Sequence, residues 1–491
     1  MVDEAPEARA SRPAECPCDN PRMRRGLPAL VALAAFVCVV VGPASLAGGA
    51  SPAAAAPIPQ RPAPPVLDDL RGPRAREAAG ALPLALGALG ALPTARETAA
   101  FAAGKVAVAV VFVESDGSVD PSTENWSRPD PDNPGDRRAN VLAKVQAALT
   151  WWNDRSPDGS LEVFLPAAGQ YGAPRTVTTR FEPISRPVSQ FNKDYRLSDA
   201  GWRWQIMGKL GYAHDRIDDS PLPERTYADK VRRKTGADWA FVLYVVDSLR
   251  DADGMFRDGA TAYTADLYGP YTVLTYDNDG YRFRHFDAVL AHEIGHVFGA
   301  LDEYAPPRPG YPSTGDLTSG YLGVRNRNAV KGGTTHLPCI MRGSQATLDA
   351  FALGELCPSS VGQTGLRDSD ADAHPNVVDT RPRFDSTATH AASSGGLTVT
   401  GIVREHPWPR GTSNIGIPFR HDISIFVPHA LQFRVDGGAW LPLVAVDGRF
   451  DEPVEKWKLT TAPLAVGDHV LEVQGTTGET AGFVKDLPAG P

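Results

Sequence analysis

The chain has 491 residues, more than one ordinary domain, so we expect two or three domains joined by non-folded segments. A hydrophobic share of 42% suits a globular core, and 44 prolines with 47 glycines indicate many loops and linkers. The formal net charge of −9 argues against a nucleic-acid-binding protein, because such proteins usually carry a basic surface.

The N-terminal segment has the pattern of an export signal. A pair of arginines precedes an apolar run at 27–42, and small residues follow, with Ala54 and Ala56 at the −3 and −1 positions of a cleavage site. The alternative is an uncleaved membrane anchor, but the run is shorter than the roughly 20 apolar residues that a spanning helix needs. We therefore expect residues 1–56 to be a signal region. The mature protein would be secreted, with membrane or cell-surface attachment only through this segment.

Residues 57–100 are rich in Ala, Pro, Gly and Leu and lack a periodic pattern, which predicts a disordered linker or a short propeptide. The elements predicted after it are a buried strand at 105–115, a helix at 137–154, strands at 161–166 and 237–248, a strand–turn–strand unit at 259–278 and a helix at 286–301. This order predicts an α/β (α+β) domain with a mixed twisted sheet, for which we expect the bounds 101–383.

Beyond residue 383 the chain changes to short alternating strands separated by Gly, Asp and Pro turns. These strands are predicted within 396–405, 423–440, 441–448 and 467–478. The pattern is typical of a small all-β sandwich. It resembles the Ig-like or fibronectin-like modules attached to bacterial secreted enzymes. The resemblance implies a β-sandwich at 384–491 that binds a surface, a glycan or the substrate, or that only spaces the preceding domain.

The helix predicted at 286–301 carries two histidines one turn apart. Its apolar residues recur at steps of three and four and form one packing face, made of Phe286, Leu290, Ile294, Val297 and Leu301. His292 and His296 project side by side on another face, where two imidazoles can bind one Zn²⁺. Glu293 is placed to face a metal-bound water as a general base without binding the metal itself. The alternative is an ordinary amphipathic helix with spare histidines.

A third zinc ligand is expected shortly after the helix, because catalytic zinc takes three protein ligands and keeps one position open. Gly299 adopts φ > 0 cheaply and can end the helix sharply, so that the chain turns back under the metal. Asp302, three residues further on, is then placed to bind it. The complete pattern is HExxHxxGxxD, from His292 to Asp302.

This pattern resembles the metzincin zinc endopeptidases. Most metzincins have a third histidine where this chain has Asp302, and aspartate occurs there in the snapalysin-like members. The tail ALDEY is similar to secreted bacterial peptidases related to the IgA-specific metallopeptidase, which have one more residue before DEY, so Glu303 stays open as the ligand. A gluzincin would use a distant helical glutamate instead, for which Glu355 is the candidate. The resemblance implies a secreted zinc endopeptidase whose partner is a polypeptide substrate, such as an extracellular or surface protein.

The resemblance also implies a methionine turn beneath the zinc, downstream of the helix. Met341 fits this role, and its thioether would pack under the histidine rings as a hydrophobic floor. The alternative is a plain core methionine. Some families have a tyrosine that stabilises the oxyanion two residues after this methionine, where this chain has Gly343. Tyr304, Tyr321 and Arg342 are the substitutes to consider.

The cysteines fall into two groups. Cys16, Cys18 and Cys38 lie in the predicted signal region, and only Cys339 and Cys357 remain in the mature chain. An even pair in an oxidising compartment predicts a disulfide. Loop-entropy reasoning gives such a bridge a stabilising effect of about 3 kcal/mol, and it would brace the methionine turn.

A second metal site is predicted in the acidic segment DSDADAHPNVVD. Aligned on a calcium loop, its ligand positions are filled by Asp368, Asp370, Asp372, Asn376 and Asp379. The segment is similar to thrombospondin type 3 and dockerin-like loops, although Ala373 replaces the usual glycine and the last ligand is shorter than the usual glutamate. The alternative to a Ca²⁺ site is a solvated acidic loop.

The sequence therefore predicts a secreted zinc endopeptidase with Glu293 as the general base. The competing hypothesis is a non-catalytic secreted adhesion or matrix-binding protein built on a metallopeptidase-like fold. The intact glutamate argues against it, because degenerate relatives commonly lose that base first. Substrate and cleavage specificity depend on pocket walls that no motif identifies.

Overall fold

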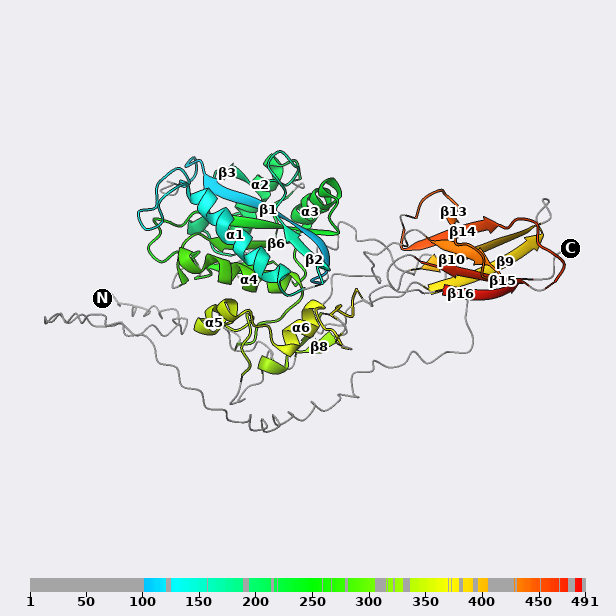
Figure 1. The fold of residues 1–491 in the computed structure, drawn as a ribbon. Helices are drawn as coiled ribbons and strands as arrows, with labels where there is room; N and C mark the ends of the chain where they lie inside the picture. Colours follow the sequence, from blue (N-terminus) through cyan, green and yellow to red (C-terminus); the bar gives the residue numbers. More distant parts are fainter. Residues whose placement is uncertain are drawn as a thin grey trace, which may run out of the picture. The chain divides into compact units, whose positions relative to one another are not determined.

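Figure 1 shows a computed structural model of the chain. It describes residues 101–487 apart from 121–124, 157, 189–193, 213–215, 219, 258, 266, 279–280, 305–314, 316, 321–322, 330–335, 370, 372, 379–382, 392–395, 405–427, 429–430, 451, 468 and 476–481. The predicted signal region and linker lie outside the described residues. Within the described ranges, every helix is too short or too polar to cross a membrane.

The first part of the structure is built on a six-stranded mixed sheet. Its strands are β1 (Gly104–Ser115), β2 (Leu161–Phe164), β3 (Arg175–Thr179), β4 (Trp239–Val246), β5 (Ala262–Thr264) and β6 (Tyr271–Thr275). Their order is β2-β1-β4-β6-β5, and β3 also pairs with β1. All pairs are parallel except β5 with β6, which are antiparallel, so the sheet ends in one antiparallel edge strand.

Helices cover both faces of this sheet. The two layers are α1 (Arg137–Asn153) with α4 (Phe286–Val297), and α2 (Asp199–Lys209) with α3 (Leu222–Thr235), which lie on opposite sides of the strands (Figure 1). Alternate residues of β1 face alternate layers, since Val108 packs in the core of α1 and α4 whereas Ala109 packs in the core of α2 and α3. Burial on both faces explains why β1 and β4 read as continuous apolar runs.

Local signals set the ends of several helices. The Asp136 carboxylate accepts a hydrogen bond from the backbone N–H of Arg138 at 2.9 Å and caps α1. Gly236 ends α3 in the left-handed conformation. The strand predicted at 105–115 is β1, the helix predicted at 137–154 is α1, and the strand–turn–strand unit at 259–278 contains β5 and β6. The sequence reading did not include α2, α3 or β3.

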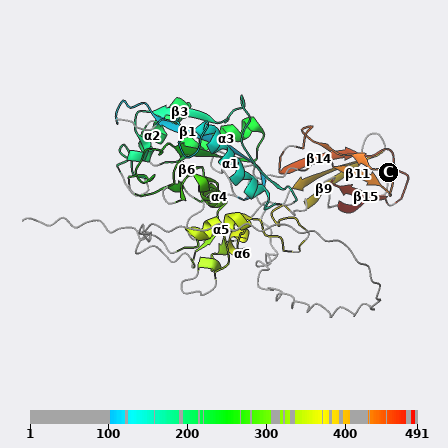
Figure 2. The same ribbon diagram turned by 60° about the vertical axis from the view of Figure 1, so that its left-hand side comes forward.

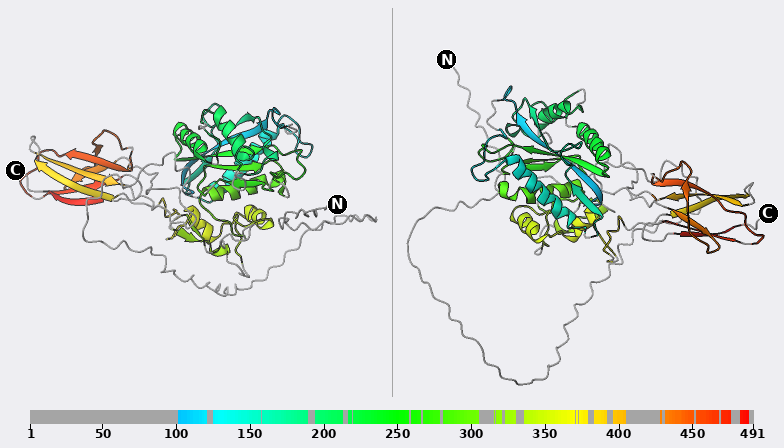
Figure 3. Two further views of the ribbon diagram at one scale, coloured as in Figure 1. Left: turned by 180° about the vertical axis from the view of Figure 1, so that it is seen from behind. Right: turned by 45° about the horizontal axis from the view of Figure 1, so that its top comes forward.

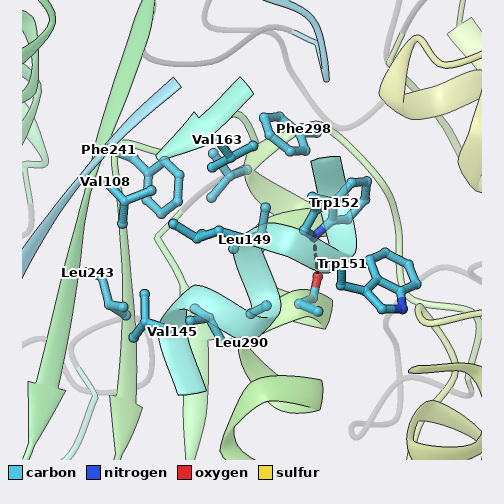
Figure 4. Close-up of a cluster of buried hydrophobic side chains, with 14 of the residues drawn as sticks. Val108, Val145, Leu149, Trp151, Trp152, Val163, Phe241, Leu243, Leu290 and Phe298 are labelled. Atoms are coloured by element: carbon cyan, nitrogen blue, oxygen red, sulfur yellow. Dashed lines mark hydrogen bonds between the residues drawn. The ribbon is translucent and has the colours of Figure 1, made fainter. Parts of the chain in front are cut away.

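The core between α1 and α4 holds the site helix in place (Figure 4). Trp152 lies fully buried against Phe298, with ring centroids 5.1 Å apart and the rings nearly perpendicular. Its indole N–H donates a hydrogen bond of 2.9 Å to the carbonyl oxygen of Ala291, one residue before the first histidine. This contact fixes the height and rotation of α4 relative to α1.

The segment after α4 adds a small second lobe to the same core. Its elements are β7 (Thr318–Ser319), β8 (Val324–Arg325), α5 (Gln345–Leu353) and α6 (Pro358–Thr364). Helices α5 and α6 lie on the side of α4 away from the sheet in each view (Figures 1 and 2). Cys339, Ile340 and Met341 are buried in the core shared with α1 and α4, so this lobe closes under the histidines.

The C-terminal part has two antiparallel four-stranded sheets, ordered β13-β14-β10-β9 and β12-β11-β15-β16. The strands are β9 (Arg383–Ala391), β10 (Leu397–Arg404), β11 (Gln432–Val435), β12 (Leu441–Pro442), β13 (Val444–Ala445), β14 (Val454–Thr460), β15 (His469–Gln474) and β16 (Gly482–Leu487). Both sheets contribute to one core, and Figure 3 shows them from two further sides. Trp457 packs so closely on Gly401 that a Cβ there would lie 2.0 Å from the indole. The assignment to an Ig-like family stays a prediction.

Candidate metal centre

The site helix α4 is buried nearly all round. The predicted apolar face, made of Phe286, Leu290, Ile294, Val297 and Leu301, is buried. The opposite side is covered by the lobe after the helix, so His292 and Glu293 are only 8% and 6% exposed. A histidine and a carboxylate buried side by side need partners, because unpaired polar groups in a protein interior are costly.

Each histidine ring is oriented by a backbone carbonyl. The Nδ1–H of His292 donates to the carbonyl oxygen of Ile340 at 2.9 Å, and the Nδ1–H of His296 donates to that of Ala300 at 2.9 Å. In neutral rings these bonds leave both Nε2 atoms free of hydrogen and turned toward the same point. The ring planes stand 88° apart with centroids 4.9 Å from each other. Such carbonyl partners are the usual means of orienting metal-binding histidines.

The chain reverses directly after α4 and brings Asp302 to the histidines. Gly299 has φ +90°, a conformation that side chains disfavour, and a Cβ there would lie 2.5 Å from the Tyr268 ring. The N–H of Ala300 donates to the carbonyl of Gly295 at 2.8 Å and closes the turn. As a result, Oδ1 of Asp302 lies 3.2 Å from Nε2 of His292 and 3.3 Å from Nε2 of His296.

The two separations from Asp302 fit ligands of one zinc ion. Ligand atoms about 2.0–2.2 Å from a tetrahedral ion lie about 3.3–3.5 Å from one another, which agrees with the two distances to Asp302. Although the Asp302 side chain is 33% exposed, its Oδ1 atom is buried and has no hydrogen-bond donor among the described residues. Burial disfavours a charged imidazole, but the Asp302 carboxylate outweighs this and raises the pKa of His296 to about 9.

Glu293 stands beside this triad and is held by the edge strand. The hydroxyl of Thr264, the last residue of β5, donates to Oε2 of Glu293 at 2.8 Å and lies 3.0 Å from its backbone carbonyl. A carboxylate oxygen of Glu293 lies within 4.8 Å of ring nitrogens of both histidines. Sequence reasoning did not identify Thr264, because its role depends on the pairing of β5 at the sheet edge.

Met341 lies directly beneath the helix turn that carries the histidines. It is fully buried, and a Cβ at Gly295 would lie only 2.4 Å from its sulfur. Its backbone carbonyl accepts a hydrogen bond of 2.9 Å from the N–H of Glu303. The methionine therefore supports α4 from below, and its neighbour Ile340 orients the ring of His292.

Glu303 points away from the histidines, although it follows Asp302 directly. Its Oε1 accepts hydrogen bonds from the hydroxyl of Ser360 at 2.9 Å and the thiol of Cys357 at 2.7 Å. The other alternative ligand, Glu355, contacts this region through its backbone carbonyl, which accepts from the N–H of Ile340 at 3.1 Å. The geometry thus groups Asp302, and neither of the two glutamates, with His292 and His296.

The predicted disulfide is not formed in this structure, where Cys339 and Cys357 are both free and buried. The Cys357 thiol donates to the Glu303 carboxylate, and the Cys339 sulfur lies 3.3 Å from the hydroxyl of Ser360 and accepts from the N–H of Cys357 at 3.3 Å. The counting argument for a bridge considered only compartment and parity. It did not take into account the buried Glu303 carboxylate, which accepts a hydrogen bond from the thiol of Cys357.

Tyr304 is the only one of the three oxyanion candidates that contacts the triad among the described residues. Its ring stacks on that of His292 with centroids 6.4 Å apart, and its hydroxyl hydrogen-bonds the Asp302 side chain. Burial, together with the carboxylates of Asp302 and Glu293, holds the pKa of Tyr304 well above its usual range. The same ring fills the space beside Gly343, where a Cβ would lie 3.2 Å from it. Tyr321 lies outside the described residues.

The predicted calcium loop is described only in part. Asp370, Asp372 and Asp379 lie outside the described residues. The Asp368 carboxylate accepts hydrogen bonds from the N–H groups of Ala371 and Ala373 at 2.8 and 2.9 Å, and the side chain of Asn376 pairs with Ser369. The loop closes on these bonds, and the calcium assignment stays a prediction.

Comparisons with known proteins add no family. No family model and no curated protein matches the chain. Among solved structures, it is similar to a GH3 beta-glucosidase from Bifidobacterium adolescentis, with TM-score 0.15, 10% identity and coverage of 82% of this chain and 51% of that one. A beta-glucosidase from Listeria innocua in complex with isofagomine has TM-score 0.14 and 10% identity, over 82% and 48% of the two chains. The chain spans about half the length of these enzymes, and TM-scores this low support no conclusion about fold or activity.

Proposed function

We propose that the chain is a zinc-dependent endopeptidase that is exported and hydrolyses peptide bonds of a polypeptide substrate. The observation that carries the proposal is the convergence of His292, His296 and Asp302 at zinc-ligand spacing, with the carboxylate of Glu293 next to it. A buried carboxylate oxygen 3.2 and 3.3 Å from two imidazole nitrogens fits a cation shared by all three residues. The arrangement supports a metal site with a general base at its side.

The chemistry divides between the metal and the residues around it. Bound zinc would polarise the substrate carbonyl and lower the pKa of a water molecule toward about 7. Glu293 accepts the proton of the attacking water on the carboxylate oxygen not engaged by Thr264, and then delivers it to the leaving amine. Thr264 keeps the carboxylate aimed during both transfers. In the metal-free site the single O–H of Tyr304 is donated to the Asp302 carboxylate; once that carboxylate binds zinc, the hydroxyl would donate to the developing oxyanion instead.

The rest of the chain fits an exported enzyme. In this proposal residues 1–56 direct export, residues 57–100 are a linker or propeptide, and the double β-sheet part at 384–491 binds a surface, a glycan or the substrate. A bound Ca²⁺ would stabilise the loop that contains Asp368. The polypeptide partner is defined here only by its chemistry, an extended chain with a scissile amide.

The direct test is hydrolysis of an unfolded protein and a peptide library by the purified mature chain. Cleavage should stop with a zinc chelator and return on adding zinc. The matched variant Glu293→Gln keeps the shape of the side chain, so it should retain the zinc content of the wild type. It should lose about two to four orders of magnitude in rate, the usual contribution of a general base. If neither protein cleaves any substrate, or both cleave equally, the non-catalytic adhesion hypothesis or a different mechanism replaces this one.

A further inference from the structure

A second set of metal-binding side chains lies behind the methionine turn. Glu303, Cys339 and Cys357 place a carboxylate oxygen and two sulfur atoms within 4.8 Å of one another. The three residues are only 4%, 0% and 1% exposed, respectively. They come from the reversal after α4, the strand-like segment before Met341 and the residue that caps α6. We call these three residues the thiol–carboxylate cluster.

Hydrogen bonds of the backbone join the segments that carry the cluster. The N–H of Glu303 donates to the carbonyl of Met341 at 2.9 Å, and the N–H of Ile340 donates to that of Glu355 at 3.1 Å. Cys357 occupies the N-cap of α6, where its sulfur accepts from the N–H of Ser360 at 3.5 Å. The three donor groups are therefore carried on a preformed frame, as a metal site requires.

Among the residues that the structure describes, no basic side chain balances the charge of the cluster. Glu303 accepts hydrogen bonds from Asn328, Ser360 and Cys357, and no lysine, arginine or histidine among the described residues forms an ion pair with it. Buried carboxylates are normally paired with a cation or coordinate a metal, because desolvation of an isolated charge is costly. The two sulfur atoms beside it are the ligands that zinc and other soft cations prefer.

We infer that Glu303, Cys339 and Cys357 form a second site for a thiophilic divalent cation, separate from the histidine site. Binding exchanges two thiol protons, released to solvent, for one cation held by two thiolates and a carboxylate, with no change of oxidation state. The ligand set excludes Ca²⁺ and Mg²⁺, which take oxygen ligands. Ser360, whose hydroxyl contacts both Glu303 and Cys339, stands beside the cation.

Such a cation would brace the zinc ligands of the histidine site from behind. Glu303 is bonded to Asp302, and Cys339 precedes Ile340, whose carbonyl orients the ring of His292. One ion would thus tie together the two segments that position these ligands, together with α6. The sequence predicts a disulfide between Cys339 and Cys357 that would brace the methionine turn. In this inference a metal ion bound by the same two cysteines braces it instead.

The test uses the full mature chain, purified under reducing conditions, dialysed against Zn²⁺ and then against metal-free buffer. Wild type should hold about two equivalents of zinc per chain. Cys357→Ser should hold about one, bound at the histidine site, and Asp302→Ala should hold about one, bound at the thiol–carboxylate cluster. Ser359→Ala, which removes a neighbouring hydroxyl on α6 that bonds Arg327, is the matched control and should keep both. Circular dichroism and melting curves show whether each variant is folded.

Cobalt replacement separates the two sites by spectrum. Co²⁺ bound to thiolates gives a charge-transfer band in the near ultraviolet, which we expect in wild type and Asp302→Ala and not in Cys357→Ser. A cobalt-loaded wild type without this band overturns the inference, whatever the variants do. If titration finds no free thiol and the mass is lower by two hydrogens, the cysteines form a disulfide and the inference is wrong. If both thiols are free but the band is absent, the cluster is only a hydrogen-bond network and the inference is also wrong. Failure of the histidine site alone would leave the thiolate band intact, so the two proposals are tested separately.

Discussion

Adjacent carboxylates in this chain have opposite surroundings. Asp302 faces two imidazole nitrogens, whereas Glu303 faces a thiol, a hydroxyl and an amide. The difference arises in the turn after Gly299, where successive side chains point to different sides. The candidate ligand of the histidine site, Asp302, and its alternative, Glu303, therefore differ by one position in the sequence but contact different partners.

We expect Asp302→Ala to release the zinc of the histidine site during dialysis. Removal of a ligand should weaken binding by more than the 10–100-fold that is typical when a partner of a ligand is changed. Asp287→Ala is the control, since Asp287 lies on α4 but pairs with Lys144 at 2.9 Å, and it should keep the metal content of the wild type. Metal analysis after dialysis decides the point. Full zinc retention by Asp302→Ala, combined with loss from Glu303→Gln, would move the ligand to Glu303.

At the scale of elements, the turn that ends α4 is the critical connection. Gly299 has a positive φ and its Cα lies against the ring of Tyr268, which is itself held by a 2.8 Å hydrogen bond from the N–H of Gly320. The ring cannot move aside without losing that bond. A side chain at position 299 would therefore be destabilised both by the positive φ and by the clash with the Tyr268 ring.

Gly299→Ala should lower the free energy of unfolding by about 2–3 kcal/mol and weaken zinc binding, because the clash adds to the strain of φ > 0. Gly236→Ala is the matched control, since it has φ +72° at the end of α3 with no atom within 4 Å of the added Cβ. It should cost about 1 kcal/mol and leave zinc binding unchanged. Chemical denaturation and zinc titration of both variants measure this. Equal effects in the two variants would show that the Tyr268 contact is unimportant.

The sequence predicted those elements whose pattern is strong and local. The pattern located strand β1 and helix α1 because each is a continuous or periodic apolar run, whereas the helix predicted at 286–301 already ends at Val297, two residues before Gly299. Helix α3 was missed because its apolar side is narrow, made mainly of Tyr227, Ala228 and Val231 in a very polar helix. The thiol–carboxylate cluster could not be predicted, because its members come from segments that only the fold brings together.

At the scale of the whole molecule, the hydrophobic cores of the described residues fall into two separate regions. Residues up to Val377 build the cores on the two faces of the mixed sheet, and residues from Leu397 onward build the core of the two antiparallel sheets. Among the described residues, no core residue belongs to both regions. The stability of each part should therefore respond only to ligands that bind within it.

Calorimetry should show two unfolding transitions, of which a zinc-selective chelator lowers only one. Zinc at 100 times its Kd stabilises by about 2.7 kcal/mol, and each kcal/mol moves the Tm of a domain of this size by about 2–4 °C. The expected decrease is thus about 5–10 °C for the transition of the part that contains α4. Glu293→Gln should show the same decrease as wild type. A single transition, or a decrease in both, would mean that the two parts unfold together.

The antiparallel pairing of β5 has a consequence for what an enzyme with this site would recognise. The bonds from Thr275 to Thr261 and from Ala265 to Tyr271 set a ladder in which the backbone groups of Thr264 point away from β6. The residue that aims Glu293 thus also offers an outward N–H and C=O, to which an extended peptide can add as a further strand. Selection would then depend on the main chain of the substrate, so unfolded segments of varied sequence would be cut and folded ones spared.

Methylating the backbone nitrogens of a cleaved peptide, with every side chain kept, should abolish its hydrolysis. Continued cleavage would show that side-chain pockets decide which peptides are cut.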